Sequence, residues 1–397
     1  MVGSRDRLAR TGVAGVYFVQ GMCFAALLTR VPALQEKFGF SEGQLSLVLL
    51  AVPVVAGVGS VLAGLLATRF GSAIVLRVGG LGVCASIVGT GLVASRTTLY
   101  LDLAAVGLFL GLVDAAMNMQ GVAVQRRYGR PVLASFHGVW SAGAIAGALA
   151  TAVTAHWRWA LGSALGAVAL LGAAIALAAG PRLLRPAEEV SPVRDNAVTR
   201  IPWAPIVAVG TAMMLMYIAD SATSNWSAVY LHTGLHSSQG VAALGLAAYQ
   251  TCMVVGRAFA DRLVARHGPV RAVSIGGAVG VLGLLVVVVA RSPAVGIAGF
   301  AVLGLGLCVV VPQSFSVAGQ LDPGGTGIAV ARVNLFNYVG FVVGAALIGL
   351  VAQSRGLRAA FLVPAVLAVG IVVLARSFRP RAVAAGDARG VRPVVGG

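Results

Sequence analysis

Three polar side chains lie close together in an otherwise apolar stretch of the chain, residues 107–147. They are Asp114, Asn118 and His137. Read as a helix, Asp114 and Asn118 share one stripe with other positions that recur at steps of three and four. These other positions are Gly107, Gly111, Gly121 and Gln125. A carboxyl group at membrane depth is costly unless it faces a partner or a watery cavity. We therefore predict that Asp114 faces a cavity; the alternative is a hydrogen bond to a neighbouring helix.

The composition indicates that most of the chain lies in a membrane. Of the 397 residues, 58% are hydrophobic and 10% are charged, and the mean hydropathy is +0.93. A soluble domain of this size does not show such a balance. A spanning helix needs about 20 apolar residues, so the sequence predicts an all-α integral membrane protein with twelve transmembrane helices. The expected spans are 11–32, 43–67, 75–95, 99–123, 133–155, 159–179, 204–231, 239–260, 272–290, 293–317, 326–352 and 358–376.

The net charge of +17 is explained by membrane topology, and we predict no nucleic-acid partner. If the N-terminus is cytoplasmic and the spans alternate, the cytoplasmic segments hold 21 of the 29 Lys and Arg residues and the outer loops hold six. This asymmetry predicts a multi-pass protein of the plasma membrane with both termini in the cytoplasm. The first apolar run follows three arginines, as in a signal peptide, but it is longer than a signal core, so we expect an uncleaved helix.

The sequence predicts two halves that repeat each other. Gly64 and Gly256 begin similar turns after the second and eighth spans, and Arg69 and Arg262 follow in each turn. We therefore expect two parallel, pseudo-symmetric six-helix halves with a substrate held between them. The expected units are an N-terminal half (1–179), a cytoplasmic linker (180–203), a C-terminal half (204–376) and a disordered cytoplasmic tail (377–397).

Five stretches carry a resemblance to a known family. They are TRVPAL (29–34), DAAMNMQG (114–121), FHGVWSAG (136–143), DSATSNWSAVY (220–230) and GRAFADR (256–262). With these stretches the chain resembles a major facilitator superfamily transporter over essentially its whole length. Within the superfamily it is similar to the YbjJ-type, fucose-permease-like branch of bacterial inner-membrane permeases. One departure is Thr68, where the turn after the second span usually carries Asp.

The resemblance implies that spans one, four, seven and ten line a central cavity. Polar residues of this chain concentrate in the same spans, and spans five and eleven add three more. The predicted substrate-binding residues are Tyr17, Gln20, Asp114, Asn118, His137, Tyr217, Asp220, Asn225, Gln313, Asn334 and Asn337. For His137, a hydrogen bond across to the fourth span is an alternative to a role with substrate or protons.

Two acids lie deep within predicted spans, Asp114 and Asp220. A carboxyl group in a low-dielectric site can load and release a proton near physiological pH. We therefore predict that one of the two couples proton movement to transport. The alternative is an ion pair in which Arg30 or Arg332 holds one of these acids and locks two helices together.

A charged turn ends the predicted eighth span. Arg257 and Asp261 are four residues apart and Arg262 follows, which suits a latch that holds one conformation and breaks in the other; Arg69 occupies the matching turn of the first half. The alternative is a basic loop that only anchors the helices in the membrane. The GxxxG pairs Gly143/Gly147 and Gly340/Gly344 are interpreted as close-packing positions.

The sequence lacks the catalytic motifs of common enzyme classes. It has no GxSxG, HExxH or Walker motif and no Cys or His cluster, so we expect no catalytic residue, cofactor or metal. The predicted function is secondary transport of a small polar, sugar-like solute by alternating access, driven by protons, by a protein that is monomeric. The alternative is proton-driven efflux of amphiphilic compounds such as antibiotics.

Overall fold

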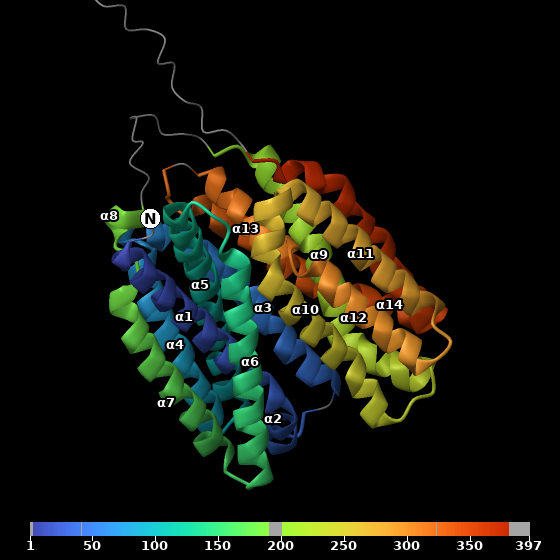
Figure 1. Ribbon diagram of the computed structural model, residues 1–397. Coiled ribbons are helices and arrows are strands. Elements are labelled where there is room, and N and C mark those ends of the chain that lie inside the picture. Colours follow the sequence, from blue (N-terminus) through green and yellow to red (C-terminus); the bar gives the residue numbers. More distant parts are fainter. Residues whose placement is uncertain (1–2, 41, 190–200, 323, 381–397) are drawn as a thin grey trace, which may run out of the picture.

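The computed structural model describes residues 3–40, 42–189, 201–322 and 324–380, and these residues form helices and no strand (Figure 1). The N-terminal helices are α1 (Ser4–Thr29), α2 (Val31–Phe38), α3 (Glu42–Phe70), α4 (Ser72–Leu92), α5 (Arg96–Tyr128), α6 (Leu133–His156) and α7 (Leu161–Ala179). A short connection holds η1 (Gly180–Arg182) and α8 (Pro186–Glu189). The C-terminal helices are α9 (Trp203–Val229), η2 (Tyr230–Gly234), α10 (Gln239–His267), α11 (Pro269–Val289), α12 (Pro293–Leu307), α13 (Val310–Gln320), α14 (Ile328–Leu374) and η3 (Ala375–Phe378).

The predicted twelve-helix membrane fold is confirmed. Within the described residues, ten helical stretches are long and apolar enough to cross a membrane. One of them, α14, has 47 residues and breaks at Gly356, whose φ of 80° is not helical, so it crosses twice. The remaining crossing is α10, which carries Arg257, Asp261 and Arg262 in its last turns.

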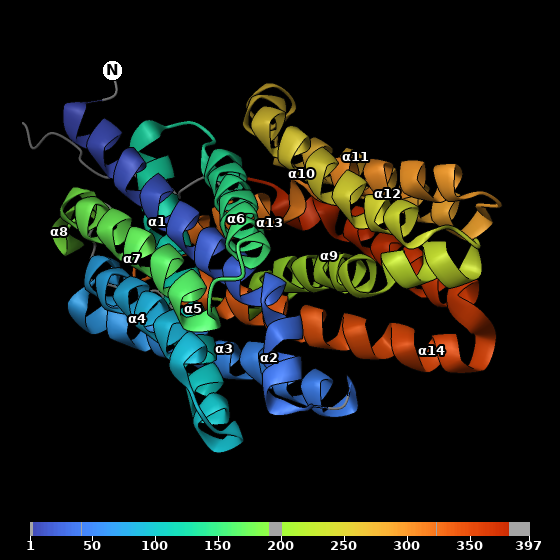
Figure 2. The ribbon, with the colours of Figure 1, turned by 90° about the horizontal axis from the view of Figure 1, so that it is seen from below.

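The helices form two groups that meet along a central interface. Figures 1 and 2 show α1–α7 on one side and α9–α14 on the other, with α8 beside the N-terminal end of α1. Across the interface, α3 packs against α14, α6 against α10, and α5 against α13. The first group ends at Ala179, where the sequence predicts the end of the N-terminal half. Residues 190–200 of the predicted linker and 381–397 of the predicted tail lie outside the described residues.

Glycines let the inner helices of each group approach backbone to backbone. A methyl group added at Gly143 of α6 would lie 2.1 Å from the Phe18 carbonyl oxygen of α1. A methyl group at Gly344 of α14 would lie 2.7 Å from the Ile218 carbonyl oxygen of α9. The interpretation of the GxxxG pairs as close-packing positions is therefore confirmed, and the contact is repeated in both groups.

This close contact predicts a large effect of Gly143→Val on stability. Overpacking a tight site costs about 1–3 kcal/mol, and here the obstacle is backbone that cannot rotate away. We expect the variant's melting temperature in detergent to fall by at least about 2 °C. The matched control is Gly166→Val on α7, because nothing lies within 4 Å of a methyl group added at Gly166. Equal melting temperatures for the two variants would contradict the tight α1–α6 contact.

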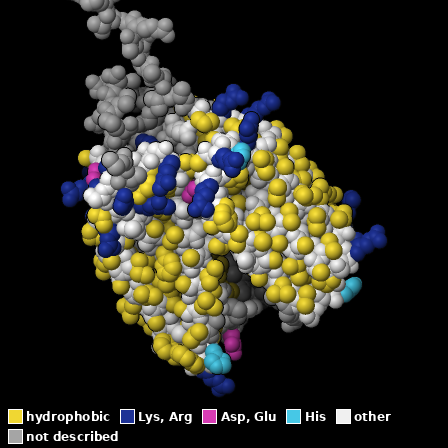
Figure 3. Space-filling model, viewed as in Figure 1, with side chains coloured by type: hydrophobic (Ala, Val, Ile, Leu, Met, Phe, Trp, Pro, Cys, Tyr) yellow, Lys and Arg dark blue, Asp and Glu magenta, His cyan; other side chains and the backbone are white. Residues whose placement is uncertain are grey.

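The two ends of the bundle differ in shape and charge. In Figure 3 Lys and Arg side chains gather at the end that carries the N-terminus, while the surface is hollowed between the two groups at the opposite end. The groups therefore touch at the basic end and separate toward the other end. The site described below lies along this interface.

Candidate functional site

Asp114 connects the two groups of helices. It projects from α5, and its Oδ2 accepts hydrogen bonds from Asn334 Nδ2 (3.0 Å), Asn337 Nδ2 (3.2 Å) and Tyr338 Oη (2.8 Å) of α14. The three donors share one face of α14 because they stand at positions i, i+3 and i+4. Asn334 also donates to Ser60 Oγ of α3 at 3.1 Å. One carboxylate oxygen thus holds α5 and α14 together.

The donors around Asp114 are all neutral. Within the described ranges the two ion pairs are Arg5–Glu188 and Asp6–Arg127, so Asp114 has no cationic partner. A carboxyl group surrounded by amides and a phenol is less firmly held in its charged form than one beside an arginine. Asp114 can therefore take up a proton without breaking an ion pair. The predicted alternative, a lock formed with Arg30 or Arg332, does not occur in this conformation.

Those two arginines have other contacts. The Arg30 guanidinium donates to the Trp159 carbonyl oxygen at 3.3 Å. The Arg332 guanidinium lies 4.3 Å from the centre of the Trp203 ring and donates to the Ile201 carbonyl oxygen. Neither arginine forms an ion pair with an acid of the described residues, and Arg30 Nε is buried without a partner there.

The predicted residues of α1, Tyr17 and Gln20, form their hydrogen bonds within the N-terminal group. The Tyr17 hydroxyl donates to Asn118 Oδ1 at 2.7 Å, and Asn118 Nδ2 donates to the Asp114 carbonyl oxygen at 2.8 Å. Gln20 accepts a hydrogen bond from the indole N–H of Trp140 on α6. Tyr17 and Asn118 therefore connect α1 to the helical turn that carries Asp114.

Asp220 is the second buried acid, on α9. Its Oδ1 accepts a hydrogen bond of 2.6 Å from the Tyr249 hydroxyl of α10. Tyr217, one turn earlier on α9, shares a helix face with Asp220 and packs against Gly340 of α14, the helix that holds Asp114. Asn225 instead donates to the Ser221 carbonyl oxygen of its own helix at 2.8 Å. The structure thus brings Tyr217 and both acids together and turns Asn225 toward its own helix.

Contacts at the basic end tie the two groups together. The two carboxylate oxygens of Asp261, on α10, accept from the backbone N–H groups of Ala134 (3.0 Å) and Ser135 (2.9 Å). These N–H groups belong to the first turn of α6 and have no partner within their own helix. Gln125 of α5 also donates to Ser316 Oγ of α13 at 2.6 Å. Asp261 therefore caps a helix of the opposite group.

The other predicted latch residues take different positions. Arg257 NH1 donates to Ser141 Oγ of α6 at 2.7 Å, which is also a contact between the groups. Arg262 is exposed, and Arg69 is exposed with its guanidinium over the ring of Phe70. The contacts between the groups therefore involve Arg257 and Asp261, and not Arg69 or Arg262.

His137 and Gln313 are buried and free of side-chain hydrogen bonds within the described part of the chain. The His137 ring packs against Phe315 of α13 at 6.1 Å between ring centres and against the edge of Tyr17 at 5.3 Å. Its Nε2 has no partner. The alternative prediction, a hydrogen bond from His137 to the fourth span, does not occur. Gln313, on α13, is 2% exposed.

Two residues of the acid network were not predicted, Tyr249 and Tyr338. Tyr338 follows the helical spacing of Asn334 and Asn337, and that spacing could have identified it. Tyr249 lies in the eighth span, which the family resemblance did not assign to the cavity.

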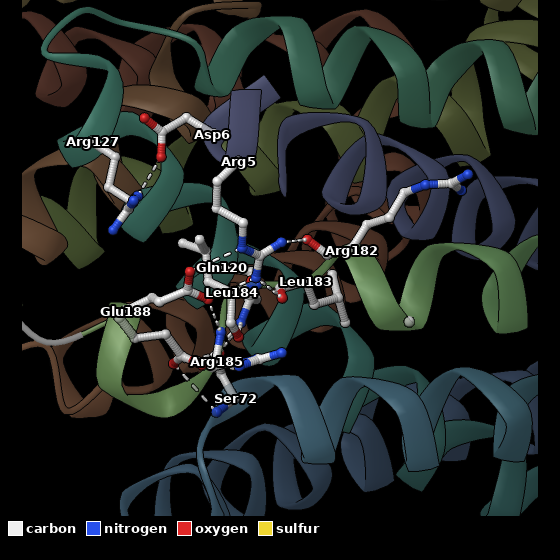
Figure 4. A network of polar contacts seen from close by, with 12 residues as sticks. Arg5, Asp6, Ser72, Gln120, Arg127, Arg182, Leu183, Leu184, Arg185 and Glu188 are labelled. Carbon is white, nitrogen blue, oxygen red and sulfur yellow. Dashed lines mark hydrogen bonds and ion pairs between the residues drawn. The ribbon is translucent and has the colours of Figure 1, made fainter. Parts of the chain in front are cut away.

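A second polar network holds the connection after α7 against the N-terminal group (Figure 4). The Arg5 guanidinium binds the Glu188 carboxylate at 2.6 Å and donates to the Leu183 carbonyl oxygen. This guanidinium lowers the pKa of Glu188 to about 2. Burial raises the pKa of Glu189, which accepts hydrogen bonds from Ser72 and from Gln120. Gln120, part of a motif that carries the family resemblance, thus binds this connection and not the cavity.

The Arg5–Glu188 pair predicts a measurable loss when Arg5 is replaced. Because the pKa of Glu188 is lowered in the folded state, the pair stabilises the protein above about pH 4.5, and this contribution is lost as the pH falls toward 2. The pair is solvent-accessible, so we expect only about 1 kcal/mol at pH 7, or roughly fivefold faster amide exchange over residues 184–189, in Arg5→Ala. The control is the exposed Arg7→Ala. Unchanged exchange in Arg5→Ala would contradict this prediction.

Comparison with known proteins gives consistent results. A family model described as Major Facilitator Superfamily matches residues 13–219 and 209–393. The chain is 30% identical over 365 residues to an uncharacterized MFS-type transporter of Yersinia pestis, covering 91% of this chain and 93% of the relative. It is 28% identical to the membrane protein MosC of Rhizobium meliloti, covering 94% and 90%.

Solved structures share the fold at low sequence identity. The fucose:proton symporter FucP of E. coli in its outward conformation superposes with a TM-score of 0.77 at 15% identity, covering 93% of this chain and 98% of FucP. The human organic anion transporter MFSD10 superposes with a TM-score of 0.77 at 16% identity, covering 93% and 99%. At these identities the likeness concerns the fold alone.

Proposed function

Because this chain belongs to the major facilitator superfamily, we propose that it moves a small polar, sugar-like solute across the bacterial inner membrane together with protons. Membership of this family shows directly that the chain is a membrane-spanning secondary transporter and not an enzyme. The proposal adds the solute class, the coupling ion and the membrane orientation.

The observation that carries the proposal is the hydrogen-bond network of Asp114 between the two groups of helices. Its carboxylate accepts three hydrogen bonds from α14. Protonation would remove the negative charge that favours these contacts and would weaken the connection between α5 and α14. A proton on Asp114 would thus change how firmly the two groups hold together. This is what coupling a proton to alternating access requires.

A polar solute is supported by the groups along the same interface. Tyr217 and Gln313 are without side-chain hydrogen bonds in the described residues, and Asn334 Oδ1 is buried without a partner. A buried polar atom left unpaired is costly, and a hydroxyl-rich solute would satisfy Asn334 Oδ1 and could also bind the side chains of Tyr217 and Gln313. FucP, whose fold this chain shares, is a fucose:proton symporter, which favours the same class.

The orientation follows from charge. Basic residues gather at the end where α8 lies, and basic residues favour the cytoplasmic side of a membrane (Figure 3). We therefore place the N-terminus and the linker in the cytoplasm, with a predicted cytoplasmic C-terminus. The hollowed end then faces outward, and the Asp261 and Gln125 contacts close the cytoplasmic side.

The rival is efflux of amphiphilic compounds, which would use aromatic walls. The indole N–H of Trp226 donates to the Ala345 carbonyl oxygen at 3.4 Å, and the Tyr17 hydroxyl binds Asn118. Both rings are therefore engaged in packing between helices, which favours a selective polar site over a loosely lined cavity.

A thermal-shift screen tests the proposal. Purified protein in detergent would be heated with hexoses, deoxy sugars, amino sugars, sugar acids, antibiotics and dyes. A ligand at a hundred times its Kd stabilises the bound state by about 2.7 kcal/mol. We expect stereoselective stabilisation by a polar solute, lost in Asn334→Ala. Stabilisation by several unrelated amphiphiles and by no polar solute would overturn the proposal in favour of efflux.

A further inference from the structure

A buried guanidinium lies at the interface and forms no ion pair with an acid of the described residues. Arg257, on α10, is 7% exposed, and its one side-chain hydrogen bond in the described residues goes to the Ser141 hydroxyl. Its Nε is buried and has no partner. Asp261, one turn away on the same helix, forms no ion pair with Arg257 in the described residues, and its oxygens accept N–H bonds from α6. A buried charge left in this way is strongly destabilising.

A second unpaired nitrogen approaches from the opposite group. His137 of α6 is 8% exposed, its Nε2 is buried without a partner in the described residues, and it lies one turn before Ser141, to which Arg257 donates. Between them α6 presents Gly138, where a methyl group would lie 3.9 Å from Arg257 Cβ, so no side chain separates the two helices at this level. Two buried nitrogens without partners, one from each group, thus flank the same part of the interface.

We propose that Arg257 and His137 bind a carboxylate group of the transported solute. This inference rests on the proposed function and narrows its solute class from neutral sugars to polyhydroxy acids such as sugar acids. A guanidinium binds a carboxylate through two parallel, charge-assisted hydrogen bonds. Arg257 NH1 already donates to Ser141, while Nε and the second terminal nitrogen form an edge that can bind both carboxylate oxygens. One guanidinium and one imidazole suit a monoanion better than a phosphate dianion.

The same arrangement connects the anion to the proton. Asp220 interacts electrostatically with Arg257 but forms no ion pair with it, and its Oδ1 is held by Tyr249. A carboxylate bound at Arg257 would share the guanidinium charge with Asp220. Protonation of Asp220 removes the competing negative charge and favours binding of the anion.

The test compares each sugar acid with its neutral parent. Wild-type protein would be titrated by thermal shift with D-galacturonate against D-galactose and with D-glucuronate against D-glucose, in the millimolar range and at constant ionic strength. We expect at least one acid to bind at least about tenfold more tightly than its parent, as charge-assisted hydrogen bonds allow. Arg257→Gln should abolish this preference. Arg332→Gln, which removes an arginine that lies on Trp203, should keep it.

The outcomes separate this inference from the proposed function. A neutral sugar that binds as well as its acid, or an acid preference retained in Arg257→Gln, would overturn the carboxylate site and leave sugar transport standing. Amphiphiles that bind when no sugar or acid does would overturn both. If Arg257→Gln does not elute as a folded protein, the wild-type comparison decides, and absence of binding by every acid counts against the site.

Discussion

Replacing Asp114 by asparagine is expected to abolish solute accumulation driven by a proton gradient. Asparagine keeps the size of the side chain but cannot exchange a proton, so the hydrogen bonds to α14 would no longer depend on protonation. We expect uphill uptake into proteoliposomes to fall by at least about tenfold, which corresponds to about 1.4 kcal/mol. Exchange of solute across the membrane without a gradient should persist, because that reaction needs no net proton movement.

The matched control for Asp114 lies on the same helix. Asp102 of α5 accepts a hydrogen bond from Thr90 of α4, within the N-terminal group, at 2.5 Å. Asp102→Asn should therefore accumulate solute normally. Accumulation at the wild-type level in Asp114→Asn would show that Asp114 only packs helices. Asp220→Asn, measured alongside, tests the other acid, and intact accumulation there would remove Asp220 from proton coupling.

Replacing Asp261 by alanine is expected to shift the protein toward a state open at the basic end. The carboxylate caps the first turn of α6 from the opposite group, and such caps contribute about 0.5–2 kcal/mol. Losing about 1–2 kcal/mol would change the ratio of the two states by about five- to thirtyfold. The shift would appear as longer distances between spin labels at positions 130 and 266, measured after replacing the four native cysteines.

The control for Asp261 is its neighbour. Arg262 is exposed and forms no hydrogen bond or ion pair with α6 in the described residues, so Arg262→Ala should leave the label distances unchanged. The contact between the groups would be irrelevant to closure if Asp261→Ala gave the wild-type distance distribution. Equal shifts in both variants would mean that the net charge of the turn matters and the helix cap does not.

The membrane spans could be predicted from the sequence because their cause is local. Each crossing needs about 20 apolar residues, and each stretch of the chain either meets that requirement or does not. The two helices that do not correspond to a single apolar span, α14 and α10, also have local reasons for it. The turn at Gly356 separates two spans that form one long helix, and α10 keeps its charges near its end, where they lie at the basic face. The close-packing glycines were also visible, because GxxxG spacing places them on one helix face.

Part of the site was visible for the same reason. A carboxyl group inside an apolar helix is costly wherever that helix packs, so Asp114 and Asp220 stood out without any knowledge of their neighbours. Tyr17, Asn118 and Asn334 followed from polar side chains at helical spacing. These predictions concern single helices, and the function of each residue stays a proposal that the variants above test.

What the sequence could not determine is which side chains meet across the interface. The donors to Asp114 lie 220 or more residues further along the chain, and a pattern within one helix does not show which face of another helix it meets. The tertiary structure decided that Asp261 caps α6, that Gln120 binds the linker, and that Asn225 turns back onto its own helix. It also decided that Arg257 has no acidic partner. Helix packing sets these pairings, because hydrogen bonds act over about 3 Å while their partners are brought together only by the fold.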